Sequence, residues 1–216
     1  MPSPLRLAAA CTATVLTASA LSLSAATVTP AQAWFTITKS CVSHTGGVLE
    51  LDRSGRTYRL TGDCQRLRVT GDDITVDAWF VSHLEVTGQG NRVEADIIYD
   101  ATVKGARNAV TAKSMRTVQV KGRGHRVTAT GLLEKAVVKA KRTTVKADRL
   151  LVVKTRGNRN TVRAGSTTRA KVVGNRNDLV HGLLDVLRVN GKRNEVRVHN
   201  GSTKVRAQGK KNNLPS

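Results

Sequence analysis

A short unit, G-x-x-N-x-V, recurs along most of this chain, and residues 187–198 contain a clear copy of it in the stretch LRVNGKRNEVRV. We number the first residue of each unit as position 0. Successive copies are 16 to 18 residues apart. A unit this short cannot bury an apolar face alone, so neighbouring units must stack on one another. Position 0 is assigned to Gly55, Gly71, Gly88, Gly105, Gly122, Ala140, Gly157, Gly174, Gly191 and Gly209.

Three further positions are apolar in nearly every copy and define the expected core. Within a unit the apolar residues alternate with polar ones, which is the periodicity of a β-strand. The pattern predicts an all-β fold, a parallel β-solenoid (β-helix) of about ten coils with a period of about 17 residues. At ~4.8 Å per coil, the rod would be roughly 43 Å long. The columns are Leu60, Val76, Val93, Val110, Val127, Val145, Val162, Leu179, Val196 and Leu214 at +5, Leu51, Leu67, Leu84, Ala101, Val118, Ala136, Val153, Ala170, Leu187 and Val205 at −4, and Val81, Ile98, Met115, Leu132, Leu150, Thr167 and Leu184 at +10.

Position +3 is usually asparagine, a residue type that suits turns and hydrogen-bonds the nearby backbone. We interpret this column as structural, with the preceding glycine adopting a positive φ and the stacked amides able to form a ladder. A row of ligand-binding amides is the alternative. His125 stands in this column and is interpreted as a turn residue, whereas His181 replaces Ala or Val and is interpreted as a core or rim residue. The asparagines are Asn91, Asn108, Asn160, Asn177, Asn194 and Asn212.

The first 33 residues have the features of an export signal. Arg6 is their only charge, a low-charge apolar run follows, and small residues at positions 31 and 33 suit signal peptidase. We predict a cleaved signal peptide at 1–33, an N-terminal cap at 34–50 and solenoid repeats at 51–216. The protein is therefore expected to be secreted, extracellular or associated with a cell wall. A lipoprotein signal at Cys11 is the alternative, although few apolar residues precede that cysteine.

Two cysteines, Cys41 and Cys64, remain after the signal. In an oxidising compartment such a pair is most simply a disulfide, and closing this loop contributes about 3 kcal/mol on the chain-entropy model. Their spacing, with only His44 nearby, does not match a zinc site. No cofactor or metal is expected.

Residues 61–71, TGDCQRLRVTG, followed by G-x-x-N-x-V units, resemble an actinobacterial family of exported proteins known as domain of unknown function 3060. The resemblance covers roughly residues 41–216. It implies a short-coil β-solenoid behind a secretion or lipoprotein signal, and it implies no activity. Members of that family are mostly rich in Thr, Ser and Asp, so the strongly basic character of this chain is a departure.

Charge divides the mature chain into two halves. The N-terminal half, residues 34–100, has seven Lys or Arg and ten Asp or Glu, a net charge of −3. The basic half, residues 101–216, has 28 Lys or Arg and five Asp or Glu, a net charge of +23. Because a solenoid stacks equivalent positions, these cations should form rows at ~4.8 Å per coil. The predicted rows are Arg107, Arg142, Arg159, Arg176, Arg193 and Lys211 at +2, Lys154, Lys171, Arg188 and Arg206 at −3, and Lys104, Lys121, Lys139 and Arg156 at −1.

Such dense cation rows predict a polyanionic partner that is bound in a salt-dependent way. A merely solvated basic face, on a structural or protein-interaction module, is the alternative. All six Trp, Phe and Tyr residues lie in the N-terminal half, which argues against a dedicated single-strand nucleic-acid binder. Teichoic acids and acidic polysaccharides are therefore favoured, with non-specific nucleic-acid binding left open. We expect Trp34 and Phe35 to cap the rod and Trp79 and Phe80 to fill an early coil; a sugar-stacking platform is the alternative.

An enzyme of the polysaccharide lyase or hydrolase type is a less favoured alternative. Asp77 and Glu94 share position +6 and should lie on neighbouring coils, as a carboxylate pair or a calcium site requires. However, Thr111 ends that row and no long loops are available to build a cleft. We therefore predict a non-catalytic protein without catalytic residues.

Overall fold

The apolar alternation of each repeat folds into one long strand that bends around a narrow core. The computed structural model describes residues 35–41 and 47–215, all within the compact unit Trp34–Ser216. Its strands are β1 (Thr36–Ser40), β2 (Leu49–Leu51), β3 (Thr57–Thr61), β4 (Asp63–Val69), β5 (Thr75–Val86), β6 (Arg92–Val103), β7 (Ala109–Arg123), β8 (Arg126–Lys141), β9 (Thr144–Arg156), β10 (Thr161–Val173), β11 (Asp178–Asn190), β12 (Glu195–Val198) and β13 (Lys204–Gln208).

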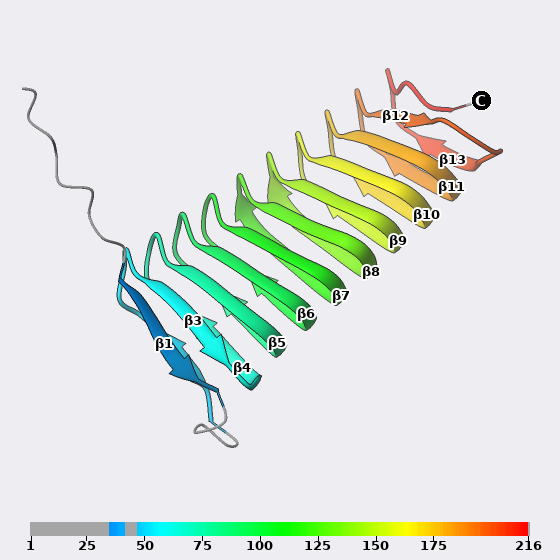
Figure 1. Ribbon diagram of the computed structural model, residues 1–216. Coiled ribbons are helices and arrows are strands. Elements are labelled where there is room, and N and C mark those ends of the chain that lie inside the picture. The colour runs from blue at the N-terminus through cyan, green and yellow to red at the C-terminus, as the bar shows by residue number, and fades with distance from the viewer. Residues whose placement is uncertain (1–34, 42–46, 216) are drawn as a thin grey trace, which may run out of the picture. The chain divides into compact units, whose positions relative to one another are not determined.

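Every strand pairing is parallel, and the strands follow one another along the stack in chain order. The pairing register repeats the sequence period, since Val145 pairs with Val162 and Val162 with Leu179. Figure 1 shows each coil as two runs of strand joined by a smooth bend at one edge and a tight turn at the other. The predicted parallel β-solenoid of about ten coils with a 17-residue period is thereby confirmed.

The core is thin and is formed by six inward positions of each coil, five of them mainly apolar. In β9, the side chains of Val145, Ala147, Leu150, Val153 and Thr155 are all buried, and their neighbours point outward. These are positions +5, +7 and +10 and, counted from the next glycine, −4 and −2. The sixth is the asparagine position, +3. The three predicted apolar columns therefore do form the core.

The predicted register is wrong in the first coil. Tyr58, not Leu60, pairs with Val76, and Leu49, not Leu51, pairs with Leu67. Gly55 is equivalent to the residues at position +2, because its N–H donates to the carbonyl of Asp72 as that of Asp73 donates to the carbonyl of Gln89. Position 0 of this coil is thus occupied by Arg53, and the first interval is 18 residues.

A second correction concerns the 18-residue coil that begins at Gly122. The pairing register of β8 shifts between Ala129 and Leu132, so Leu133 pairs with Met115 and Leu150. Leu133 is fully buried, whereas Leu132 is only half-buried. The extra residue of this coil is absorbed as a β-bulge, which turns the predicted core residue outward.

The asparagine column forms a buried ladder that joins one coil to the next. The backbone N–H of Asn160 donates to Oδ1 of Asn177, and Nδ2 of Asn177 donates to the carbonyl of Gly157, each at 3.0 Å. The same bonds recur at the other asparagines. His125 takes over the role: Nδ1 accepts from Asn108 N–H and Nε2 lies 2.9 Å from the carbonyl of Lys121. The structural interpretation of this column is confirmed.

The N-terminal end of the stack is closed by a disulfide between Cys41 and Cys64, as predicted. The predicted signal peptide and Trp34 lie outside the described residues. Within 34–50, β1 and β2 pair in parallel with β3 and β4, so the described part of this range extends the stack. No helix capable of crossing a membrane is found in residues 35–41 and 47–215.

The predicted core packing of Trp79 and Phe80 is wrong. Trp79, which is predicted to fill an early coil, is instead 62% exposed. Phe35, which is predicted to cap the rod, is 78% exposed, and the capping role stays a prediction. Phe80 is half-buried and meets the ring of Tyr99 edge-on, with ring centroids 5.1 Å apart. The core positions of this coil are taken instead by Ala78 and Val81. The side chains of Trp79, Phe80 and Tyr99 therefore lie on the outside of the bend edge.

Candidate functional site

The predicted row at position +2 lies on the tight-turn edge, where each residue adopts a left-handed backbone conformation. The values of φ are +54° for Arg142, +58° for Arg159, +56° for Arg176 and +56° for Arg193. L-residues other than Asn, Asp and Gly rarely adopt this conformation, which costs about 1–2 kcal/mol. In the N-terminal half the same column holds residues that tolerate it, namely Gly55, Asp73 and Gly90. The arginines are therefore unfavourable choices for the turn itself.

A cationic groove, which we call the turn groove, runs along this edge of the basic half and has a volume of about 620 Å³. Seven of its nine lining residues carry positive charge and the other two are asparagines. Four come from the predicted +2 row, and the remaining five come from position +1, which sequence reasoning had not singled out. The lining residues are Arg123, Lys141, Arg142, Asn158, Arg159, Asn175, Arg176, Lys192 and Arg193.

Position +1 forms a second, outer ladder along the groove. Oδ1 of Asn158 accepts the backbone N–H of Asn175, and Oδ1 of Asn175 accepts that of Lys192, each at 2.8 Å. The main chain thus uses the amide oxygen of each asparagine and leaves its Nδ2 group without a role in this ladder. No hydrogen bond from either Nδ2 is found within the described part of the chain. Both are unused donors beside the cations.

The predicted row at position −3 also exists, on the face that precedes the turn. Lys154 pairs with Lys171, Lys171 with Arg188 and Arg188 with Arg206 in the strand register. A second groove of about 480 Å³ is lined by the last three of these cations together with small apolar and amide side chains. The structure thus places the −3 row on the strand face that leads into the turn, and the +2 row on the turn itself.

None of the ten cations in these two rows forms an ion pair with any residue that the structure describes, and all ten are exposed. Arg107 contacts only the side-chain oxygen of Gln89, at 3.2 Å. Their mutual repulsion is therefore uncompensated within the described chain, and their charges are available to a partner.

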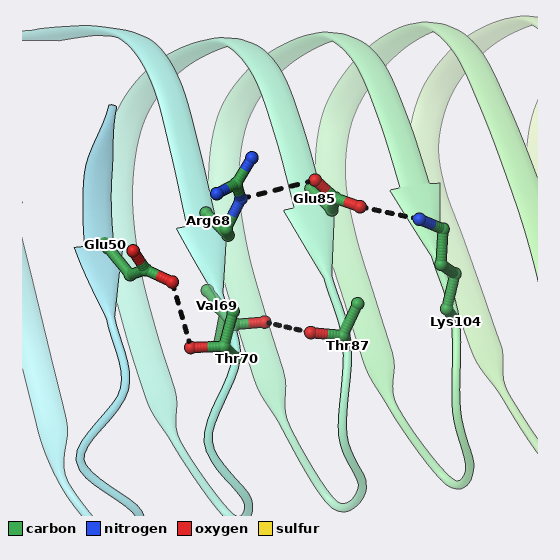
Figure 2. A network of polar contacts seen from close by, with 7 residues as sticks. All are labelled: Glu50, Arg68, Val69, Thr70, Glu85, Thr87 and Lys104. Atoms are coloured by element: carbon green, nitrogen blue, oxygen red, sulfur yellow. Dashed lines mark hydrogen bonds and ion pairs between the residues drawn. The ribbon is translucent and has the colours of Figure 1, made fainter. Parts of the chain in front are cut away.

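Position −3 is built differently in the N-terminal half, where acids and bases alternate (Figure 2). The carboxylate of Glu85 lies 3.4 Å from Arg68 and 2.6 Å from Lys104. The Lys104 ammonium lowers the pKa of the Glu85 carboxyl, with a smaller contribution from Arg68. Glu50 begins the same row and accepts a hydrogen bond from the Thr70 hydroxyl. This fold therefore accommodates a neutralised row at the position that is purely cationic further along.

The predicted carboxylate pair is neighbouring but neutralised by arginines. Asp77 and Glu94 are strand partners, as expected. Arg59 lies 3.4 Å from Asp77, and Arg92 contacts Glu94. Among residues 35–41 and 47–215 there is no group of three or more His, Cys, Asp or Glu that could hold a metal ion.

The two buried histidines belong to the framework. Burial lowers the pKa of His125 within the ladder. His181 is completely buried, and burial lowers its pKa to about 4. Its Nδ1 is 2.9 Å from the hydroxyl of Thr167, and its Nε2 has no partner among the described residues. His181 is therefore a core residue, one of the two placements predicted for it.

No protein-family model, curated protein or solved structure was found to match this chain. The resemblance to domain of unknown function 3060 stays a prediction. Inferences about function therefore depend on the geometry and charge described above.

Proposed function

We propose that this protein is a secreted, non-catalytic β-solenoid that binds anionic polymers of a cell wall or extracellular matrix through the cation rows of its basic half. Teichoic acids and acidic polysaccharides are the favoured partners. The lack of Trp, Phe and Tyr in the basic half favours recognition by charge over recognition by base stacking.

The observation that carries this proposal is the contrast between equivalent positions of one fold. Position −3 holds an acid–base row at Glu50, Arg68 and Glu85 and an unpaired cation row from Lys154 to Arg206. Because the fold accepts either row, stacking does not require the cations. Like charges ~4.8 Å apart also repel one another, which costs stability. A polyanion compensates that cost by neutralising the row and releasing its counterions.

The backbone of the turn groove supports the proposal independently. Arginine replaces glycine and aspartate at a left-handed position, against its conformational preference. Residues held in unfavourable backbone conformations are concentrated at functional sites. We therefore attribute the presence of arginine at position +2 to the function of its side chain.

A protein-interaction module is a second candidate, favoured by the exposed aromatics of the bend edge. Trp79 is 62% and Tyr99 45% exposed, and Lys113 and Arg116 lie over these rings. Aromatic and arginine side chains are enriched at protein interfaces. Both rings belong to the N-terminal half and lie outside the predicted cation rows, so removing Trp79 and Tyr99 should affect this candidate and leave polyanion binding unchanged.

The test replaces Arg159, Arg176 and Arg193 together by Asn, which suits the left-handed conformation and removes three charges. Heparin affinity and its salt dependence are measured. We expect a ten- to hundredfold loss of affinity, from roughly 0.5–1 kcal/mol per exposed ion pair, and a salt slope smaller by about 2. The same variant should unfold at a higher temperature, because it removes strain and repulsion at three sites.

The matched control replaces Arg59, Arg68 and Arg92 by Gln, which changes the net charge equally but removes cations that already have acidic partners. Its heparin affinity should fall less than threefold. An equal loss in both variants, or elution of the wild-type protein at low salt, would contradict the proposal.

A further inference from the structure

The asparagines of the turn groove use only part of their hydrogen-bonding capacity within the fold. In Asn158 and Asn175 only Oδ1 takes part in the outer ladder, by accepting a backbone N–H of the next coil. The Nδ2 donors remain in a groove whose other lining residues are all cationic. Each N–H donor there can serve an anionic oxygen, since hydrogen bonds to charged acceptors are the strong ones.

The N-terminal half shows which part of this side chain the ladder requires. At the same position Asp72 accepts the backbone N–H of Gln89 at 2.9 Å, and Ser54 accepts that of Asp72 at 2.9 Å. A carboxylate and a hydroxyl therefore satisfy the ladder as an amide does. Aspartate lacks a donor, and serine has one only on a shorter side chain. Asparagine at 158 and 175 combines an uncharged acceptor for the backbone with an amide N–H donor on a longer side chain.

The groove extends along the rod. Its lining residues come from five successive coils, from Arg123 to Arg193, which span about 19 Å at ~4.8 Å per coil. All nine lining residues occupy positions +1 and +2 of successive turns, so the groove offers a single line of contacts along the rod. One extended polymer strand matches such a line of contacts.

We propose that the turn groove binds a single extended strand of an unbranched anionic polymer running parallel to the rod, and that Nδ2 of Asn158 and of Asn175 donates to its anionic oxygens. This inference rests on the proposed function and adds the ligand's shape and two contact residues. The shared ligand chemistry is one phosphate, sulfate or carboxylate group per repeat of a linear chain.

The first test measures binding of length-graded linear polyphosphate, heparin oligosaccharides and oligogalacturonate, with a DNA duplex as the wide comparison ligand. Affinity should rise with length until the oligomer spans about 19 Å and then level off. The duplex should bind at least tenfold more weakly per charge than the linear chains. Which of the three chains binds best identifies the anion. Equal binding of the duplex, or no dependence on length below this span, would overturn the inference.

The second test uses the two substitutions for which the chain itself provides precedents. Asn158→Ser with Asn175→Ser retains a ladder acceptor but replaces each amide N–H donor by a hydroxyl on a shorter side chain, and we expect a three- to tenfold weaker binding of the best chain with an unchanged salt slope. Asn158→Asp with Asn175→Asp also retains the acceptor but adds two negative charges. Its affinity should fall at least tenfold. Both should melt within a few degrees of the wild type.

The outcomes separate the two proposals. If both asparagine variants bind normally while the arginine variant loses affinity, polyanion binding stands and the role of Asn158 and Asn175 is wrong. If the wild-type protein shows no salt-sensitive binding of any chain, the proposed function itself fails. A large drop in melting temperature of the serine variant would assign its effect to folding, and the aspartate variant then decides, because Asp72 already shows that a carboxylate fits the ladder.

Discussion

The two halves of this rod share one framework and differ in the charge of the residues on its surface. Both have the same inward columns, the same inner asparagine ladder and the same parallel register. At position −3 the N-terminal half has Glu50, Arg68 and Glu85 in turn (Figure 2). The last four units of the basic half present only lysine and arginine there. At position +2 the first half has Gly and Asp, and the second has arginine in five units, Lys211 in one and Gly124 in one. In this protein the inward residues determine the coil, and the outward residues vary independently of it.

That separation predicts that the inner ladder matters equally in both halves. Asn91→Ala and Asn177→Ala each remove an acceptor for a buried backbone N–H and a donor to a buried carbonyl. We expect each to lower the free energy of unfolding by about 2–4 kcal/mol, measured by chemical denaturation. Neither should alter the salt slope of heparin binding by the folded protein. A cost confined to one half would show that the framework is not shared.

A second prediction concerns a local exception in the core of the basic half. His181 occupies a position that is alanine in most coils, and Thr167 one that is otherwise larger and apolar. The folded-state pKa of His181, about 4, is below the ordinary value of 6.5. The unfolded chain therefore binds the proton first, so stability is full above pH 6.5 and falls as the pH decreases toward 4. The expected loss is on the order of 2–3 kcal/mol.

Replacing His181 by Ala together with Thr167 by Leu should remove this pH dependence. The double change reproduces the Leu150 and Ala164 pair found one coil earlier and eliminates the unpaired Nε2. Denaturation curves at pH 7.5 and pH 4.5 should then differ less than those of the wild type. A wild-type protein whose stability does not change between these pH values would refute the assignment.

The smallest expected effect comes from transferring the ion-pair row into the basic half. Lys171→Glu places an acid between Lys154 and Arg188, as Glu85 lies between Arg68 and Lys104. We expect stability to rise by about 0.5–1 kcal/mol at low salt, with the gain lost in high salt. Heparin affinity should fall severalfold. Lys146→Glu, at another outward position, is the matched control, and an equal loss of affinity there would mean that net charge alone decides binding.

Much of the framework could be predicted because the same sequence pattern recurs in every coil of a solenoid. The aliphatic columns and the asparagines recur in up to ten copies, so the core positions and the turn were identified correctly. The errors occurred where a copy departs from the average. Arg53 at position 0 of the first coil hid its register, and the bulge after Ala129 exchanged Leu132 for Leu133.

The candidate site was predicted less completely. The repeat spacing shows which residues line up from coil to coil, but it does not show which group each side chain hydrogen-bonds to. The rows at +2 and −3 follow from spacing alone. The contribution of position +1 was missed, although Asn158 and Asn175 are visible one residue after the glycines. A second left-handed residue in the turn could have been identified from the glycines at position +2. These are Gly55, Gly90 and Gly124, which alternate in that column with Asp73 and the arginines.

The inner ladder has a direction, since each coil is closed by the asparagine of the coil that follows it. Asn194 closes the coil before its own, and Asn212 in turn bonds to Asn194 N–H and to the carbonyl of Gly191. Gaining or losing one whole unit therefore leaves every remaining donor matched to an acceptor. Repeat number can drift in a lineage without a folding defect, and each added unit lengthens the turn groove by ~4.8 Å. Evolution can thus change the length of polymer that such a rod contacts by changing the number of its coils.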